Sequence, residues 1–184
     1  NEIMPSYDPP TVMGIFMHQA RRFGDRRMSL AKKEGVWQTK TWRQALEALP
    51  AAVMGLVSLG LQKGDAVGII SRTRREWSEA DMTILTAGGV AIGIYPSASL
   101  WEMTHVISHS ELQICFVEDE PLLEKLLAVR VKTGLPRTMI LFEPSDRPLP
   151  PDVMTLDNLI AHGRIAYEAD PSRFETIWRA VRPE

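Results

Sequence analysis

The sequence predicts an α/β fold built on a mostly parallel, doubly wound sheet, with a helix and a hairpin ahead of it. Three observations predict this class: short apolar runs recur between residues 64 and 142, glycine or polar turns bound them, and helical segments separate them. Continuous apolar runs are typical of parallel strands that are buried on both faces. The four predicted strands are Ala66–Ser71, Ala91–Tyr95, Ile114–Val117 and Thr138–Phe142.

A helix and a hairpin are predicted before the sheet. Thr11 is suited to cap a helix, the apolar residues after it have helical spacing, and a Gly-Asp pair ends the helix after Phe23. The segments Met28–Lys32 and Gly35–Lys40 flank a short polar break at Lys33-Glu34. Two such segments around a polar break are typical of a β-hairpin.

A long helix is predicted next. Thr41 and Gln44 have the spacing of a capping box, and Gly60 supplies a stop after Leu59. Pro50 lies inside this helix and is expected to bend it, because proline lacks the backbone donor that an interior position needs.

Helical segments with recognisable start signals separate the predicted strands. Ser99 and Glu102 form a second capping box, and Pro121 is suited to the first turn of a helix. The predicted helices cover about Arg75–Ala87, Ser99–Ser110 and Pro121–Val129.

The chain divides into three predicted segments. Residues 1–63 hold the first helix, the hairpin and the long helix, and residues 64–142 hold the parallel α/β unit. Residues 143–184 begin with a loop, since four prolines lie between Glu143 and Pro151. Two short helices are expected after it, at Leu156–Ala161 and Ser172–Val181.

Composition excludes several classes of function. The 184 residues include 21 basic and 23 acidic side chains, and the net charge of −2 lacks the excess of basic residues that is typical of nucleic-acid binding. The longest apolar run, residues 51–61, is too short to cross a bilayer, and no secretion signal opens the chain. Cys115 is the single cysteine, which excludes an intrachain disulfide. We therefore expect a cytoplasmic protein in which Cys115 is a small core residue of a strand.

Motifs for nucleotide or hydrolase chemistry are missing from the sequence. It contains neither G-x-x-x-x-G-K-[ST] nor G-x-G-x-x-G, and it lacks a G-x-S-x-G nucleophile elbow. Gly88 and Gly93 have the spacing of the first motif, but Ile94 stands where the lysine is needed.

A basic turn follows the first predicted strand. Arg72, Arg74 and Arg75 lie at the carboxyl end of that strand, where doubly wound folds place ligands, so they are candidates for binding phosphate. The alternative is a solvated turn in which Arg74 or Arg75 pairs with Glu79 along the next helix.

Other polar residues also have two interpretations. Glu118-Asp119-Glu120, at another strand end, could bind a hard cation or form a solvated loop that favours the next helix N-terminus. His105 and His109, one helical turn apart, could share a metal, but nothing nearby supplies the remaining ligands, so a solvated helix face is preferred and no metal site is assigned. Packing explains Trp77 and Tyr95 without any function.

Several segments together resemble the opening third of an AMP-forming acyl-CoA ligase, most closely a long-chain fatty-acid–CoA ligase. They are Thr39-Lys40-Thr41-Trp42, Gly60-Leu61-Gln62-Lys63-Gly64-Asp65, Glu76-Trp77 and Tyr95-Pro96-Ser97. The chain departs from the family pattern at Thr73, where asparagine is common, and at Leu100, where proline is common.

The resemblance implies the first sheet unit of an adenylate-forming enzyme, in which a fatty acid reacts with ATP and then with CoA. It implies ATP, Mg²⁺ and CoA for the parent enzyme and none for this chain alone, because the phosphate loop and the catalytic lysine would lie beyond Glu184. No catalytic residue is therefore assigned. Tyr95, Pro96 and Ser97 are candidates to lie near CoA. We also expect a peripheral membrane contact of the parent and self-association of the fragment.

Two further functions stay open at this point. One is a free-standing α/β binding domain for a small phosphorylated ligand, held by the turn that contains Arg72 and Arg75. The other is an assembly module, because an uncovered apolar face favours association.

Overall fold

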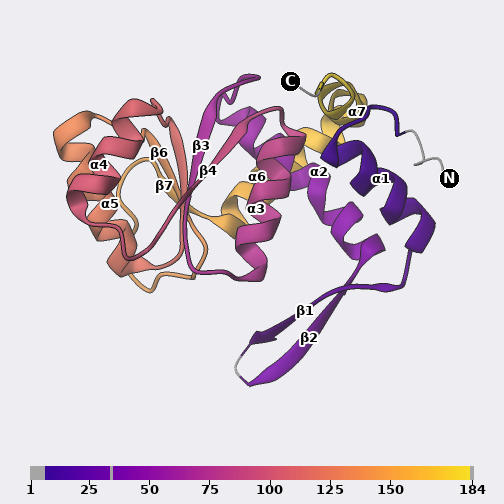
Figure 1. The fold of residues 1–184 in the computed structure, drawn as a ribbon, viewed down its shortest axis with the longest axis horizontal. Coiled ribbons are helices and arrows are strands. Elements are labelled where there is room, and N and C mark those ends of the chain that lie inside the picture. Colours follow the sequence, from indigo (N-terminus) through magenta and orange to yellow (C-terminus); the bar gives the residue numbers. More distant parts are fainter. Residues whose placement is uncertain (1–6, 34, 183–184) are drawn as a thin grey trace, which may run out of the picture.

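The computed structural model describes residues 7–33 and 35–182, and its centre is a five-stranded parallel sheet (Figure 1). Neighbouring strands follow the order β4-β3-β5-β6-β7, and each adjacent pair is parallel. The predicted parallel sheet is confirmed, with all four expected strands side by side. The strands are β3 (Ala66–Ile70), β4 (Val90–Ile94), β5 (Ile114–Val117), β6 (Thr138–Leu141) and β7 (Val153–Thr155).

Helices cover both faces of this sheet, as in a doubly wound fold (Figure 1). The core on one face includes Met103 of α4 (Leu100–His109) and Leu126 of α5 (Glu120–Thr133). The core on the other face is formed with α2 (Trp42–Ser58), α3 (Arg75–Thr86) and α6 (Leu156–Ala169), together with the terminal helices α1 (Val12–Phe23) and α7 (Pro171–Arg179). None of the helices within residues 7–33 and 35–182 is long and apolar enough to cross a membrane.

The order of the strands creates a switch point between β3 and β5. The chain runs from β3 outward to β4 on one side, and then returns past β3 to place β5 on the other side. In open α/β sheets, ligands bind at the carboxyl ends of the two strands that flank such a point. A ligand site is therefore expected at the carboxyl ends of β3 and β5.

The N-terminal elements follow their predicted signals. The Thr11 side chain accepts a hydrogen bond from the Gly14 amide at 3.1 Å and so caps α1. Strands β1 (Arg27–Lys33) and β2 (Val36–Thr41) pair as an antiparallel hairpin, which confirms that prediction, although Glu34 of the predicted break is outside the described residues. Thr41 forms the expected capping box of α2. Pro50 lies inside α2, and the bend expected there stays a prediction.

The C-terminal part contains the main differences from the sequence prediction. Strand β7 was not predicted, because its three residues follow a proline-rich loop and carry too short a pattern to indicate a strand. It adds a strand from residues 143–184 to the sheet, while the three-segment division itself stays a prediction. Helix α6 runs to Ala169 rather than Ala161, so it continues through Gly163.

Close contact between α2 and α6 explains why the helix tolerates that glycine. A Cβ at Gly163 would lie 1.8 Å from the Ala51 carbonyl oxygen and 2.4 Å from the Gly55 nitrogen. A Cβ at Gly55 would lie 2.6 Å from the Leu159 carbonyl oxygen. The two glycines therefore let the helix backbones touch, and this packing offsets the low helix propensity of glycine.

Candidate functional site

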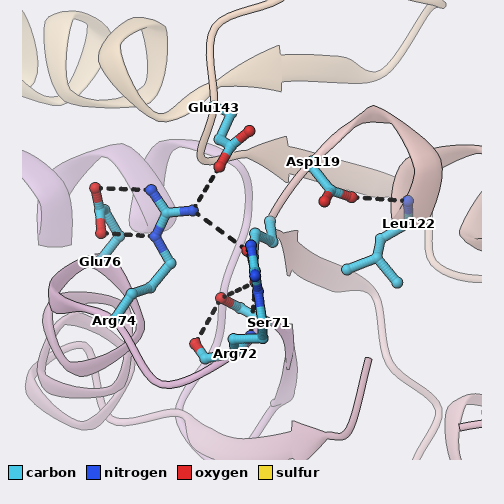
Figure 2. Close-up of polar contacts among 8 residues, drawn as sticks. Ser71, Arg72, Arg74, Glu76, Asp119, Leu122 and Glu143 are labelled. Carbon is cyan, nitrogen blue, oxygen red and sulfur yellow. Dashed lines mark hydrogen bonds and ion pairs between the residues drawn. The ribbon is translucent and has the colours of Figure 1, made fainter. Parts of the chain in front are cut away.

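The candidate site lies where β3 and β5 end, at the switch point of the sheet (Figure 2). Ser71 and Arg72 directly follow β3, and Glu118 directly follows β5, whose last residue Val117 pairs with Ile70. The register of the two strands therefore brings these three residues together. The Glu118 amide also donates to the Ile70 carbonyl at 3.0 Å, which continues the ladder up to the site.

Glu118 is the centre of the site. Only 1% of its surface is exposed, and its carboxylate accepts four hydrogen bonds from two residues. Oε2 accepts from the Arg72 amide at 2.6 Å and from the Ser71 hydroxyl at 3.0 Å. Oε1 accepts from Nε and Nη2 of Arg72, at 2.8 and 2.5 Å. Burial removes the carboxylate from water at a cost in free energy, and these four hydrogen bonds compensate for that cost.

The titration of Glu118 follows from that environment. Burial on its own raises the pKa of a carboxyl group, but the hydrogen bonds from Arg72 and Ser71 outweigh burial and hold the pKa of Glu118 below its ordinary value. The same pairing raises the pKa of Arg72. Both groups are therefore charged at neutral pH.

Arg74 extends the site to two more carboxylates (Figure 2). Its Nε and Nη2 donate to the two oxygens of Glu76 at 2.8 and 3.1 Å, and its Nη1 donates to Glu143 at 2.9 Å. The same Nη1 lies 3.6 Å from Oε1 of Glu118. The hydrogen bond to Glu76 is the main cause that raises the pKa of Arg74. Two arginines thus meet three glutamates, so the cluster has a formal charge of −1.

The third arginine of the turn has a different role from the one expected. Glu79 was predicted to pair with Arg74 or Arg75, and this is wrong: it pairs with Lys40 of β2 at 2.6 Å. Arg75 instead donates to the Gln38 backbone carbonyl at 2.5 Å. Both contacts join the hairpin to the start of α3. Sequence spacing favoured the local pair because it cannot show that β2 passes beside α3.

The acidic triplet after β5 is divided among three roles. Asp119 accepts from the Leu122 amide at 3.0 Å and caps α5, as its position at the helix start predicts. Glu120 accepts from the Ser145 hydroxyl at 2.5 Å and pairs with Arg147. Glu118 is buried, so the prediction of a solvated loop is wrong for that residue. Across residues 7–33 and 35–182, no group of three or more metal-ligating side chains is present.

The three residues predicted to lie near CoA are at the carboxyl end of β4, the edge strand next to β3. Tyr95, Pro96 and Ser97 follow β4 and form a turn that the Ala98 amide closes on the Tyr95 carbonyl at 2.9 Å. Tyr95 is 82% exposed, so the expectation that it packs is wrong, whereas Trp77 does pack against the core. The exposed turn shares the carboxyl side of the sheet with the Glu118 cluster. Its proximity to CoA stays a prediction.

The histidine pair and the cysteine lie in contrasting environments. His105 and His109 are exposed on α4 and stack in a row with Trp101, with ring centroids 5.6 and 5.9 Å apart. Cys115 is fully buried in β5, and burial raises the pKa of its thiol. The prediction that Cys115 is a small core residue is confirmed.

Sequence reasoning missed the partners that complete the site. It placed the arginine turn and the acidic triplet at strand ends but did not pair Arg72 with Glu118. The available signal was that both residues directly follow strands predicted to be neighbours. Nothing in the sequence pattern indicates Glu143, which reaches Arg74 from the start of a loop 69 residues later.

Comparison with known proteins identifies the family. The model of the AMP-binding enzyme family matches residues 16–160. The long-chain-fatty-acid–CoA ligase ACSBG2 of Xenopus laevis is 29% identical over 97% of this chain and 24% of its own length. The long-chain-fatty-acid–CoA ligase FadD15 of Mycobacterium bovis is 40% identical over 47% of this chain and 14% of its own length. The chain thus spans about a quarter or less of these relatives.

Solved structures share the fold at low sequence identity. The anthranilate CoA ligase AuaEII, in complex with anthranoyl-AMP, has a TM-score of 0.68 at 17% identity over 86% of this chain and 29% of its own. A luciferase-like enzyme from the mealworm Zophobas morio has a TM-score of 0.70 at 17% identity over 87% of this chain and 36% of its own. The predicted α/β fold with a mostly parallel, doubly wound sheet agrees with these neighbours. With the family match over residues 16–160, the chain belongs to the AMP-binding enzymes.

Proposed function

We propose that this chain is the N-terminal α/β unit of a long-chain fatty-acid–CoA ligase, called here the parent protein. The parent would convert a fatty acid, ATP and CoA into acyl-CoA, AMP and pyrophosphate through an acyl-adenylate. The observation that carries the proposal is the alignment of 97% of this chain with a ligase of that name. The single cysteine, Cys115, is a buried free thiol, which supports the cytoplasm as the proposed location of the parent.

Within residues 7–33 and 35–182, the candidate site offers no free set of side chains that would hold the triphosphate of ATP or its Mg²⁺. Formation of an adenylate needs donors and a cation aimed at the triphosphate. The Glu118 carboxylate is already enclosed by four hydrogen bonds, and Asp119 caps a helix. We therefore propose that this unit supports the site, while the groups that act on ATP belong to other parts of the parent. No step of the reaction is assigned to these residues.

The alternative of a binding domain for a phosphorylated ligand has little support from the geometry. Arg72 and Arg74 are both engaged by carboxylates, and the cluster with Glu76, Glu118 and Glu143 has a formal charge of −1. A phosphate at this point would displace a carboxylate or add to a negative charge. The cluster is better suited to hold the ends of β3 and β5 together.

The CoA side of the proposal concerns Tyr95, Pro96 and Ser97. Their turn is exposed and lies at the carboxyl end of an edge strand, so a ligand could reach it without rearrangement of the core. In the parent, Tyr95→Ala would raise KM for CoA and leave KM for ATP unchanged. Trp101→Ala removes another exposed aromatic side chain and serves as the matched control.

The experiment measures acyl-CoA formation by the parent protein with long-chain and short-chain fatty acids. We expect thioester formation that depends on ATP, CoA and a long-chain acid. A parent protein that makes no thioester from any fatty acid would contradict the proposal. Preference for a short or aromatic acid would retain the family and reject the long-chain assignment.

A further inference from the structure

Positive charge is concentrated in one short part of the chain. Residues 21–41 contain seven basic and two acidic side chains, a formal charge of +5. The other 163 residues contain 14 basic and 21 acidic side chains, a formal charge of −7. A protein with a net charge of −2 is therefore strongly polarised, and its positive part consists of the end of α1 and the β1–β2 hairpin.

The basic side chains of this part are available to a partner. Among the residues that the structure describes, six of the seven form no ion pair with a carboxylate, and the seventh, Lys40, pairs with Glu79. The six are Arg21, Arg22, Arg26, Arg27, Lys32 and Lys33. Figure 1 shows the hairpin extending away from the helices and the sheet. The hydrogen bonds from Lys40 to Glu79 and from Arg75 to the Gln38 carbonyl attach the base of the hairpin to α3.

One face of the hairpin combines this charge with exposed apolar side chains. In the antiparallel register Lys32 faces Trp37, and Leu30 lies two residues before Lys32, so the three share a face. Trp37 is 64% exposed and Leu30 is 46% exposed. The Lys32 ammonium lies 6.0 Å from the centroid of the Trp37 ring. Val36, which pairs with Lys33 on the opposite face near the end of the ribbon, is also exposed.

We propose that the β1–β2 hairpin docks on an anionic lipid surface. Arginine and lysine near such a surface are attracted to its headgroups, and an exposed tryptophan is suited to the boundary between headgroups and acyl chains. The contact that we propose is peripheral, with the hairpin at the level of the headgroups. The hairpin would bind by its charge and by burying Trp37 and Leu30, which form its exposed apolar face.

Two other occupants fit the hairpin less well. A second copy that docks hairpin to hairpin would bring two segments of the same positive charge together, which electrostatic repulsion opposes. A soluble polyanion such as RNA would satisfy the charges, but a bare phosphate chain would leave Leu30 and Val36 in water. An anionic bilayer satisfies both the charge and the apolar side chains.

Sedimentation with phosphatidylcholine vesicles, with and without phosphatidylserine, tests the proposal on the purified chain. We expect binding only to vesicles with phosphatidylserine, and loss of that binding at high salt. Because each basic residue near an anionic surface changes affinity about five-fold, Lys32→Gln with Lys33→Gln should weaken binding about 25-fold. The control Lys132→Gln with Arg137→Gln removes two exposed charges elsewhere and should change affinity little.

A second measurement locates the contact without a charge change. Vesicles with brominated acyl chains should quench the fluorescence of Trp37, so Trp37→Phe should abolish most of the quenching and Trp101→Phe should not. Three results would overturn the proposal: no preference for phosphatidylserine, equal losses in the hairpin and control variants, or tighter binding to poly(A) RNA than to the vesicles. A parent protein that shows no vesicle binding would also overturn it, independently of whether the parent makes acyl-CoA.

Discussion

Arg72 encloses the buried carboxylate of Glu118 with both its backbone and its side chain. The amide donates to Oε2 at 2.6 Å, and the guanidinium Nε donates to Oε1 at 2.8 Å. The carboxyl ends of β3 and β5 are therefore held together at the point where the order of strand addition reverses. Arg72 is itself 76% exposed in its side chain, so water covers one side of the pair.

Replacing Glu118 with glutamine should destabilise the fold. The variant keeps the shape of the side chain but loses the charge that Arg72 and Arg74 share, so we expect a loss of about 2 kcal/mol in the free energy of unfolding. Urea unfolding followed by circular dichroism measures this loss. Glu168→Gln, the same change at an exposed position, is the control. Equal stability of the two variants would show that the cluster contributes nothing measurable.

The Glu118 contribution should depend on pH in a defined direction. Because the folded state lowers the pKa of Glu118 below its ordinary value of 4.5, the unfolded chain takes up this proton first as pH falls. The stabilisation is complete above that value and is lost as pH falls through the lower pKa of the folded state. The stability difference between wild type and Glu118→Gln should therefore shrink below about pH 4.5. A difference that grows in acid would contradict this account.

Gly163→Ala should destabilise the contact between α2 and α6. Alanine is the better helix former, but its Cβ would lie 1.8 Å from the Ala51 carbonyl oxygen, so the two helices must separate. We expect a net loss of about 2–3 kcal/mol, measured by urea unfolding. His162→Ala, one residue earlier and exposed, should cost much less. A Gly163→Ala protein as stable as wild type would show that the close approach is not required.

The isolated chain should self-associate. Several large apolar side chains are exposed, including Val90 on the edge strand β4 and Ile165 on α6. At about 25 cal/mol per Å² of apolar surface, covering even a modest patch offsets part of the entropy lost on association. Sedimentation velocity over a range of concentrations measures the tendency. A monomer at all concentrations, without binding of a hydrophobic dye, would indicate a self-contained unit.

Local signals in the sequence predicted most of the fold. The caps at Thr11, Thr41 and Ser99 act as their side chains indicate, and β5 has the predicted bounds, because each depends on neighbours within a few residues. Strand β7 and the full length of α6 were missed. Both depend on partners far away in the chain, β6 for the strand and α2 for the helix.

The site was predicted only in part, for a related reason. Strand ends placed Arg72 and Glu118 on the same side of the sheet, but pairing them required the order of the strands. The predicted pair between Glu79 and Arg74 or Arg75 was wrong, because Lys40 of β2 lies beside Glu79 and pairs with its carboxylate. Burial of Glu118 could not be predicted from composition, since an acidic triplet is normally solvated.

Fatty-acid-dependent exchange between ATP and pyrophosphate tests the central claim most directly, because it reports formation of the acyl-adenylate alone. The parent protein and the purified 184-residue chain are compared with the same long-chain fatty acid. The account predicts exchange by the parent and none by the chain above a control without protein. Exchange by the chain alone would contradict the claim that its residues support the site without acting on ATP, and a parent without exchange would contradict the proposed ligase.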